Sequence, residues 1–223
     1  MNNKTIYNSA LFSLITQFII GIICTIGLFI PIKPKDQVLN SILVMETIVQ
    51  FIEFVFYYWL VKNINNINYD VTYIRYFDWV ITTPTMLLSL IIFMIYINSN
   101  EIITFTGVIQ DNSNKIFQIL SLNAFMLLFG FLGEIKYLSK TLSFLFGSIF
   151  FVMSFALIYF NYVKNSTLNN YIFYINFIIW ALYGISFLLS YTNKNIMYNI
   201  LDIFSKNLNG LFFLFYILYI NYY

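Results

Sequence analysis

The stretch VTYIRYFDWVITTPTMLLSLIIFMIYI, residues 71–97, predicts how the whole chain is built. It carries two charged side chains, Arg75 and Asp78, and nothing charged follows them before its end. A helix that crosses the hydrocarbon core of a bilayer needs about 20 predominantly apolar residues. Residues 71–97 therefore predict one membrane span.

The rest of the chain has the same character. Of its 223 residues, 61% are hydrophobic and only 9% are charged, whereas a soluble domain carries about 25% charged residues. We expect a multi-pass integral membrane protein made of one all-α domain over residues 1–223, a bundle of seven transmembrane helices. The spans are expected at residues 6–30, 38–61, 71–97, 116–134, 141–163, 168–192 and 195–222. Between the third and fourth, the segment ITFTGVI is expected to form a short hairpin.

Charge and residue usage exclude several kinds of function. The net charge of +2 offers no basic patch for nucleic acid. The chain has no histidine, which removes histidine metal sites and histidine proton relays, and we expect no metal site. Its single cysteine, Cys24, cannot form an intrachain disulfide. Lysines are spread almost evenly between alternate loops, so the positive-inside rule does not orient the chain.

Charged side chains inside apolar spans are the candidates for function, because burying an ionised group in a membrane costs several kcal/mol. Asp202 and Lys206 are four residues apart and share a helix face. Arg75, Asp78 and Thr82 are stacked in the same way. The spacing predicts a buried cluster with Lys206 between Asp78 and Asp202, and a structural ion pair in a transporter would have the same spacing.

Two of these segments resemble the microbial rhodopsins. RYFDWVITTPTMLLS, residues 75–89, resembles their third-helix signature, and LDIFSK, residues 201–206, resembles their seventh-helix retinal-lysine motif. NAFMLLFG at 123–130 and WALYGISF at 180–187 extend the resemblance over the whole chain. It is closest to the group-one viral rhodopsins of giant algal viruses, also called viral channelrhodopsins.

The resemblance implies a photoreceptor rather than an enzyme, with all-trans-retinal as cofactor. Lys206 would form the Schiff base with retinal, and Asp78 and Asp202 would be its counterions. Arg75 would bias these carboxylates toward ionisation, and Thr82 would hydrogen-bond Asp78, the proton acceptor. The residues implied to line the polyene are Trp79, Thr83, Met86, Met126, Gly130, Phe146, Trp180, Tyr183 and Phe187.

Two positions depart from the proton pumps of that family. Ser89 stands where outward pumps have a carboxylate that donates a proton, so fast pumping is not expected. Asn123 stands where the fourth helix often has an aspartate, and it keeps the ability to hydrogen-bond without titrating.

Polar residues form three helical stripes that predict a hydrated path beside the chromophore. The candidate path residues are Ser13, Gln17, Glu46, Gln50, Glu53, Ser89, Asn195 and Asn199. Hydrogen bonds between helices would account for the serine and glutamine residues equally well. They do not account for two carboxylates, and carboxylates that line a narrow path favour cations.

We therefore expect a light-gated cation channel, which is also what the resemblance implies. The alternatives are a slow outward proton pump and a sensory rhodopsin. The expected partners are retinal, membrane lipid and transported cations or protons, with homo-oligomerisation left open. The resemblance further implies an extracellular N-terminus and, for a viral protein, the host cell membrane.

Overall fold

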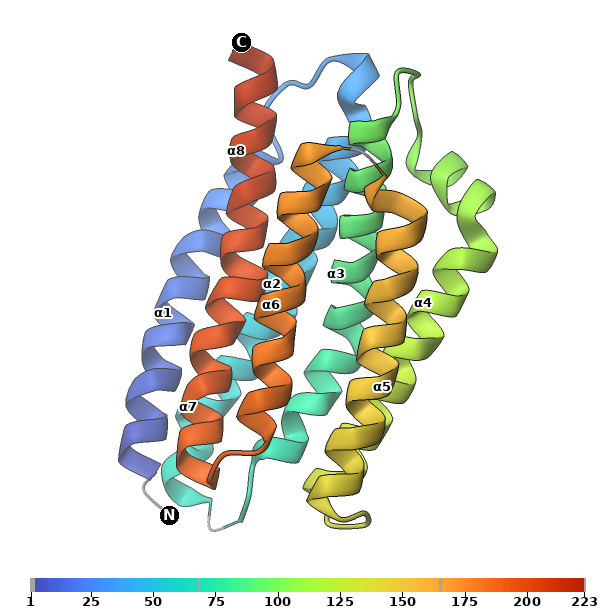
Figure 1. The fold of residues 1–223 in the computed structure, drawn as a ribbon. Helices are drawn as coiled ribbons and strands as arrows, with labels where there is room; N and C mark the ends of the chain where they lie inside the picture. Colours follow the sequence, from blue (N-terminus) through green and yellow to red (C-terminus); the bar gives the residue numbers. More distant parts are fainter. Residues whose placement is uncertain (1–2, 68, 165, 223) are drawn as a thin grey trace.

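The structure is a computed structural model that describes residues 3–67, 69–164 and 166–222. Within them, seven helical segments are long and apolar enough to cross a membrane. They run side by side along one axis, with the start of α1 at one end of the bundle and the end of α8 at the other (Figure 1). The expected all-α bundle of seven transmembrane helices is confirmed.

The first six spans are built from single long helices with short 3₁₀ or π extensions. They are α1 (Asn3–Gly27), α2 (Gln37–Asn63), α3 (Arg75–Asn98), α4 (Phe105–Glu134), α5 (Lys140–Ile158) and α6 (Thr167–Phe187). Short 3₁₀ turns flank α2 and precede α3 at Pro34–Asp36, Ile64–Asn66 and Thr72–Ile74. A π-helical turn, Tyr159–Val163, extends α5.

The seventh span is one continuous helical segment with a π-helical turn in its middle. It consists of α7 (Tyr191–Asp202), the π turn η5 (Ile203–Asn207) and α8 (Leu208–Tyr222). A π turn widens the helix and rotates the residues that follow it, and such turns are frequent at functional sites. Lys206 and Asn207 lie in this turn, and both side chains are buried.

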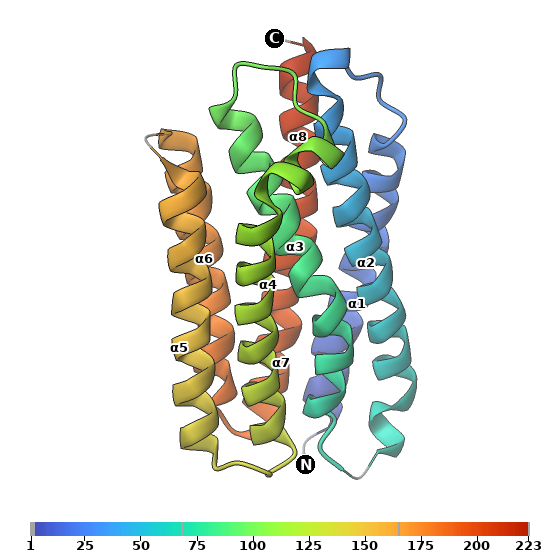
Figure 2. The same cartoon turned by 90° about the vertical axis from the view of Figure 1, so that its right-hand side faces the viewer.

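The hairpin expected within residues 98–114 is wrong, because α4 begins at Phe105 rather than at residue 116. The Thr104 side chain caps this helix by accepting a hydrogen bond from the Gly107 N–H at 3.1 Å. An N-cap threonine satisfies a free N–H of the first turn and fixes a helix start. The first turns of α4 run at an angle to the rest of the helix (Figure 2).

Side chains divide between a lipid-facing surface and a mixed interior. Large apolar side chains such as Phe29 and Phe160 are 83% and 80% exposed, as lipid contact requires. The interior holds an apolar core where α2 begins and α8 ends, and its main members are Leu39, Ile42, Leu43, Leu90, Phe93, Phe213 and Ile217. Charged and polar side chains fill the middle of the interior, and a second apolar cluster that includes Ile6, Leu60 and Ile64 lies where α1 begins and α2 ends.

Candidate functional site

Lys206 lies at the centre of a buried group of carboxylates. Its Nζ donates a hydrogen bond to Asp78 Oδ2 at 2.8 Å, and it lies 3.2 Å from Glu53 Oε1 and 3.5 Å from Asp202 Oδ1. The structure thus brings together Lys206, Asp78 and Asp202, as their spacing predicts. It adds Glu53, which the sequence analysis assigned to the ion path beside the chromophore.

The charges of this cluster almost balance. Arg75 Nη1 lies 3.4 Å from Asp202 Oδ2, so the cluster holds two cations, Arg75 and Lys206, and three carboxyl groups. Their side chains are at most 3% exposed. With all three carboxyl groups ionised, the cluster carries one negative charge more than its two cations compensate, and an uncompensated buried charge is costly. The cluster is therefore suited to take up and release a proton.

Asp202 is held rigidly, whereas Asp78 is not. Tyr57 Oη and Tyr183 Oη each donate a hydrogen bond to Asp202, both at 2.7 Å, in addition to its ion pair with Arg75. Asp78 Oδ2 accepts from Lys206, but Asp78 Oδ1 is buried without a hydrogen-bond partner. A carboxylate with a free oxygen beside a protonated nitrogen is the better proton acceptor of the two.

Thr82 and Arg75 contact the two aspartates in different ways. The Thr82 hydroxyl donates to the backbone carbonyl of Asp78 at 3.1 Å, and not to its carboxylate. Arg75 pairs with Asp202, one of the two expected counterions, and its Nε and Nη2 donate to Asn195 and Asn199. Arg75 thus braces the cluster from the side where α7 begins.

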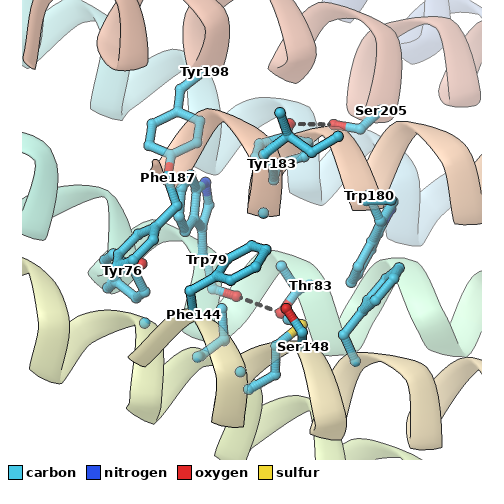
Figure 3. A pocket seen from close by; sticks show the side chains of 18 of the residues that line it. Tyr76, Trp79, Thr83, Phe144, Ser148, Trp180, Tyr183, Phe187, Tyr198 and Ser205 are labelled. Carbon is cyan, nitrogen blue, oxygen red and sulfur yellow. Dashed lines mark hydrogen bonds between the residues drawn. The ribbon is translucent and has the colours of Figure 1, made fainter. Parts of the chain in front are cut away.

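A largely apolar cavity of about 340 Å³ extends from Lys206 between α3, α4, α5 and α6 (Figure 3). Eight of the nine residues expected around the polyene line it: Trp79, Thr83, Met86, Met126, Gly130, Trp180, Tyr183 and Phe187. Asn123 lies behind this wall and donates to the Thr83 hydroxyl at 2.8 Å. An amine at one end of an apolar cavity fits a long apolar aldehyde such as retinal.

Phe146 does not line the cavity, so this assignment is wrong. Its side chain is 40% exposed and packs on Phe129, with ring centroids 5.1 Å apart. The face of α5 that does line the cavity carries Phe144, Gly147 and Phe151. These three recur at steps of three and four, the spacing of one helix face, and Phe146 falls outside that series.

Several residues that line the cavity were not predicted from the sequence. Tyr76, Tyr198, Ser148 and Ser205 line it as well, and Tyr183 Oη lies 2.7 Å from Ser205 Oγ (Figure 3). Ser205 precedes Lys206 in the motif LDIFSK, so its position beside the lysine carried a signal. The tyrosines carried none, because tyrosine is abundant throughout this chain.

The expected path residues are all buried at the interface of α1, α2, α3 and α7. Gln17 donates to Ser13 at 3.2 Å, and Ser13 donates to the backbone carbonyl of Asn199 at 3.2 Å. The Ser89 hydroxyl donates to Glu46. Many polar atoms here have no hydrogen-bond partner in the protein: Gln17 Oε1, Glu46 Oε2, Gln50 Oε1, Glu53 Oε2 and both Asn207 amide atoms. Such atoms need water or an ion as partner.

Comparison with known proteins agrees with this geometry. The family model described as bacteriorhodopsin-like protein matches residues 9–220. The chain is similar to the crystal structure of viral rhodopsin OLPVRII, with 29% identity and a TM-score of 0.86 over 96% of this chain and 98% of that chain. No curated protein matches.

More distant structures share the fold alone. A blue light-absorbing proteorhodopsin from Med12 has 18% identity and a TM-score of 0.77, and covers 98% of both chains. Acetabularia rhodopsin I has 20% identity and a TM-score of 0.78, over 98% of this chain and 96% of that chain. Because the family model spans nearly the whole chain, this protein belongs to the bacteriorhodopsin-like family, the microbial rhodopsins, whose chromophore is retinal.

Proposed function

We propose that this protein is a light-gated cation channel of the group-one viral rhodopsin type. One observation carries the proposal: Glu53, the inner carboxylate of the polar stripe on α2, lies 3.2 Å from Lys206 Nζ. The candidate path and the candidate chromophore site therefore share a side chain. A change of charge at Lys206 acts directly on the path.

Lys206 would hold retinal as a Schiff base, with the residues of the apolar cavity around the polyene. Retinal, when bound, supplies the absorption of visible light and an isomerisation that reorients the nitrogen. Asp78 would take the proton from the Lys206 nitrogen, because its Oδ1 is free. Asp202 would stay ionised, because Arg75, Tyr57 and Tyr183 all stabilise its negative charge.

Loss of that proton would remove the positive charge that pairs with Glu53. A buried carboxylate without its cation attracts another cation, or water, into the site. Glu53, Gln50 and Glu46 follow one another along one face of α2, so a cation that enters at Glu53 meets further polar groups. Carboxylates in a narrow path favour cations over anions.

By the same resemblance, we propose that α1 begins on the extracellular side. The Arg75 side of the cluster would then face the outside, and the end where α2 begins would face the cytoplasm.

A slow outward proton pump is the second candidate. The hydrogen bond between Lys206 Nζ and Asp78 favours it, because a proton acceptor at 2.8 Å is what outward transfer requires. A pump and a channel differ in how their currents depend on voltage.

Whole-cell voltage clamp under illumination, in cells supplied with all-trans-retinal, tests the proposal. For a channel, the photocurrent reverses sign at a voltage that follows the cation gradient. Outward current at every voltage would establish a pump instead. Lys206→Ala is the control, and we expect it to lack both the visible absorption band and the photocurrent.

A further inference from the structure

Glu46 stands apart from the other acidic side chains of the interior. It lies on α2, is 0% exposed, and accepts a hydrogen bond from the Ser89 hydroxyl on α3. Its second oxygen, Oε2, is buried without a partner at hydrogen-bond distance, and the Asn209 amide on α8 and the Cys24 thiol on α1 also face this carboxyl group. Within residues 3–67, 69–164 and 166–222, no lysine or arginine lies within ion-pair distance of it.

This environment favours the neutral carboxylic acid over the carboxylate. A buried carboxylate without a cation costs several kcal/mol, and it avoids that cost by holding a proton. Asp78, Asp202 and Glu53 differ, because each lies within 3.5 Å of Lys206 Nζ. Glu46 is thus the carboxyl group on these helices that is best placed to store a transferable proton.

Glu46 also lies on the opposite side of Lys206 from Arg75. It precedes Glu53 by seven residues, which is about 10.5 Å along the helix at 1.5 Å per residue. Its partner Ser89 follows Asp78 by about 16 Å along α3 at the same rise. Because α2 and α3 are antiparallel, both displacements point toward the end where α2 begins (Figure 2).

We propose that Glu46, held by Ser89, is the proton donor that returns a proton to the nitrogen of Lys206 after Asp78 has taken one. This inference rests on the proposed photoreceptor function. The O–H bond of Glu46 breaks and an N–H bond forms on the Lys206 nitrogen, while the electron pair stays on the Glu46 carboxylate. The Ser89 hydroxyl stabilises that carboxylate until water from the end of the bundle where α2 begins returns a proton to it.

The interval between Glu46 and Lys206 is polar enough to guide such a transfer. Gln50 lies between Glu46 and Glu53 on the same face of α2, and its Oε1 is buried without a partner. Asn207, next to Lys206, has both amide atoms buried without partners. These groups can hold bridging water molecules at little cost. Ser89 alone would not serve as a donor, so α2 supplies the carboxyl group that α3 lacks.

The test is flash spectroscopy of purified, retinal-loaded protein, which follows the return of the proton to the Lys206 nitrogen at several pH values. In the unmodified protein the rate should be independent of pH, because the proton comes from inside. In Glu46→Gln it should fall roughly 10²-fold, the contribution of a positioned proton donor, and should then slow further as pH rises. Thr47→Val is the matched control, because the Thr47 hydroxyl donates to the Leu43 carbonyl within its own helix.

A second variant separates loss of the donor from damage to the fold. In Glu46→Gln with Ser89→Asp, a carboxyl group returns to the same contact from α3, and the fast, pH-independent rate should return. Infrared spectra in the dark should contain a protonated-carboxyl band that Glu46→Gln removes, in the retinal-free apoprotein as well.

Two results would overturn the proposal: a rate unchanged in Glu46→Gln, or an infrared spectrum that the substitution does not alter. These readouts are independent of conduction. If the protein carries no gradient-driven current while Glu46→Gln slows proton return, the channel proposal is wrong and Glu46 is still the proton donor.

Discussion

Asp78 and Asp202 both end in a carboxyl group, and both carboxyl groups lie close to Lys206 Nζ, at 2.8 Å and 3.5 Å. Their other contacts give them different tasks. Asp202 accepts two tyrosine hydroxyl groups and pairs with Arg75, whereas Asp78 keeps one oxygen free. Asp202 therefore anchors charge and Asp78 exchanges it.

Replacing each aspartate by asparagine separates the two tasks. Asp202→Asn leaves the buried guanidinium of Arg75 without its carboxylate and should lower the free energy of unfolding by about 3–5 kcal/mol. Asp78→Asn keeps that ion pair and should cost less stability, while it abolishes light-induced proton transfer from Lys206. Thermal unfolding followed by circular dichroism measures the first effect, and flash spectroscopy measures the second. Equal losses of stability would contradict the division of tasks.

Acidification should shift the visible band in the same direction as substitution of Asp78, because both remove the negative charge of this side chain. Excitation of retinal moves positive charge away from the nitrogen, so a carboxylate beside the nitrogen raises the excitation energy. Protonating Asp78 should therefore shift the visible band to the red as pH falls. Asp78→Asn should already absorb further to the red at neutral pH and should shift less on acidification, as an absorption titration of both proteins would measure.

The aromatic residues of α5 show what sequence alone leaves undecided. Phe144 lines the cavity and Phe146 packs on Phe129. Matching one phenylalanine among the many in this chain did not choose between them. The choice depends on which face of α5 turns inward, and apolar residues cover every face of a lipid-facing helix.

Paired alanine substitutions on α5 test the corrected assignment. Phe144→Ala removes a side chain from the cavity wall and should shift the visible band and slow the uptake of retinal severalfold. Phe146→Ala removes a partly exposed side chain and should leave both unchanged. Absorption spectra recorded during reconstitution with all-trans-retinal measure both. A shift in Phe146→Ala alone would restore the original assignment.

At the scale of helices, the polar stripe of α2 was predictable, but its contacts with Lys206 and Ser89 were not. Glu46, Gln50 and Glu53 follow the helical repeat, so their common face is evident from sequence. Which of them contacts Lys206 depends on the axial offset between α2 and the seventh span, and the spacing of residues within one helix does not give that offset. The same holds for Ser89, whose contact with Glu46 joins two helices.

The position of Glu53 beside Lys206 changes what its substitution should do. Glu53→Gln keeps the size of the side chain but removes a charge 3.2 Å from the nitrogen. We expect the photocurrent to fall at least severalfold, and the visible band to shift to the red through the same electrostatic effect as at Asp78. Glu46→Gln should weaken the photocurrent less and leave the colour unchanged, because Glu46 lies about two turns away.

Voltage clamp and absorption spectra of the two variants give the comparison, with Thr47→Val as control on the same helix. Full, gradient-reversible current in both glutamine variants would show that the stripe on α2 is not the conduction path.

Helix ends were less predictable than helix interiors. Hydropathy identified the seven spans, because long apolar runs dominate the sequence. It missed the first turns of α4, where Gln110, Asp111 and Asn112 lie in a helix. The Thr104 N-cap was the available signal, but the β-branched and aromatic residues around it favoured strands instead.

Over the whole molecule, the interior has a polar middle and, toward the end where α2 begins, an apolar half. On α1, α2, α3 and the seventh span, the inward face is polar where it meets the cluster around Lys206 and becomes apolar toward the end where α2 begins. The apolar half is formed by Ile20, Leu39, Leu43, Leu90, Phe93, Phe213 and Ile217, all buried. The candidate path is therefore closed beyond Glu46 by packed side chains.

A channel must hydrate this apolar half when it opens, so a polar group there should favour the open form. Leu43 is 0% exposed and lies one turn beyond Glu46 on the face of the stripe. Leu43→Asn should raise the current in the dark and slow its closing after light by several-fold, because water no longer meets a wholly apolar barrier. Val44→Asn is the matched control, since Val44 is 37% exposed and faces away from the interior. Whole-cell currents in the dark and after a light pulse measure both variants. If Leu43→Asn folds, binds retinal and conducts like Val44→Asn, then the barrier lies elsewhere and cations do not leave Glu46 along α2.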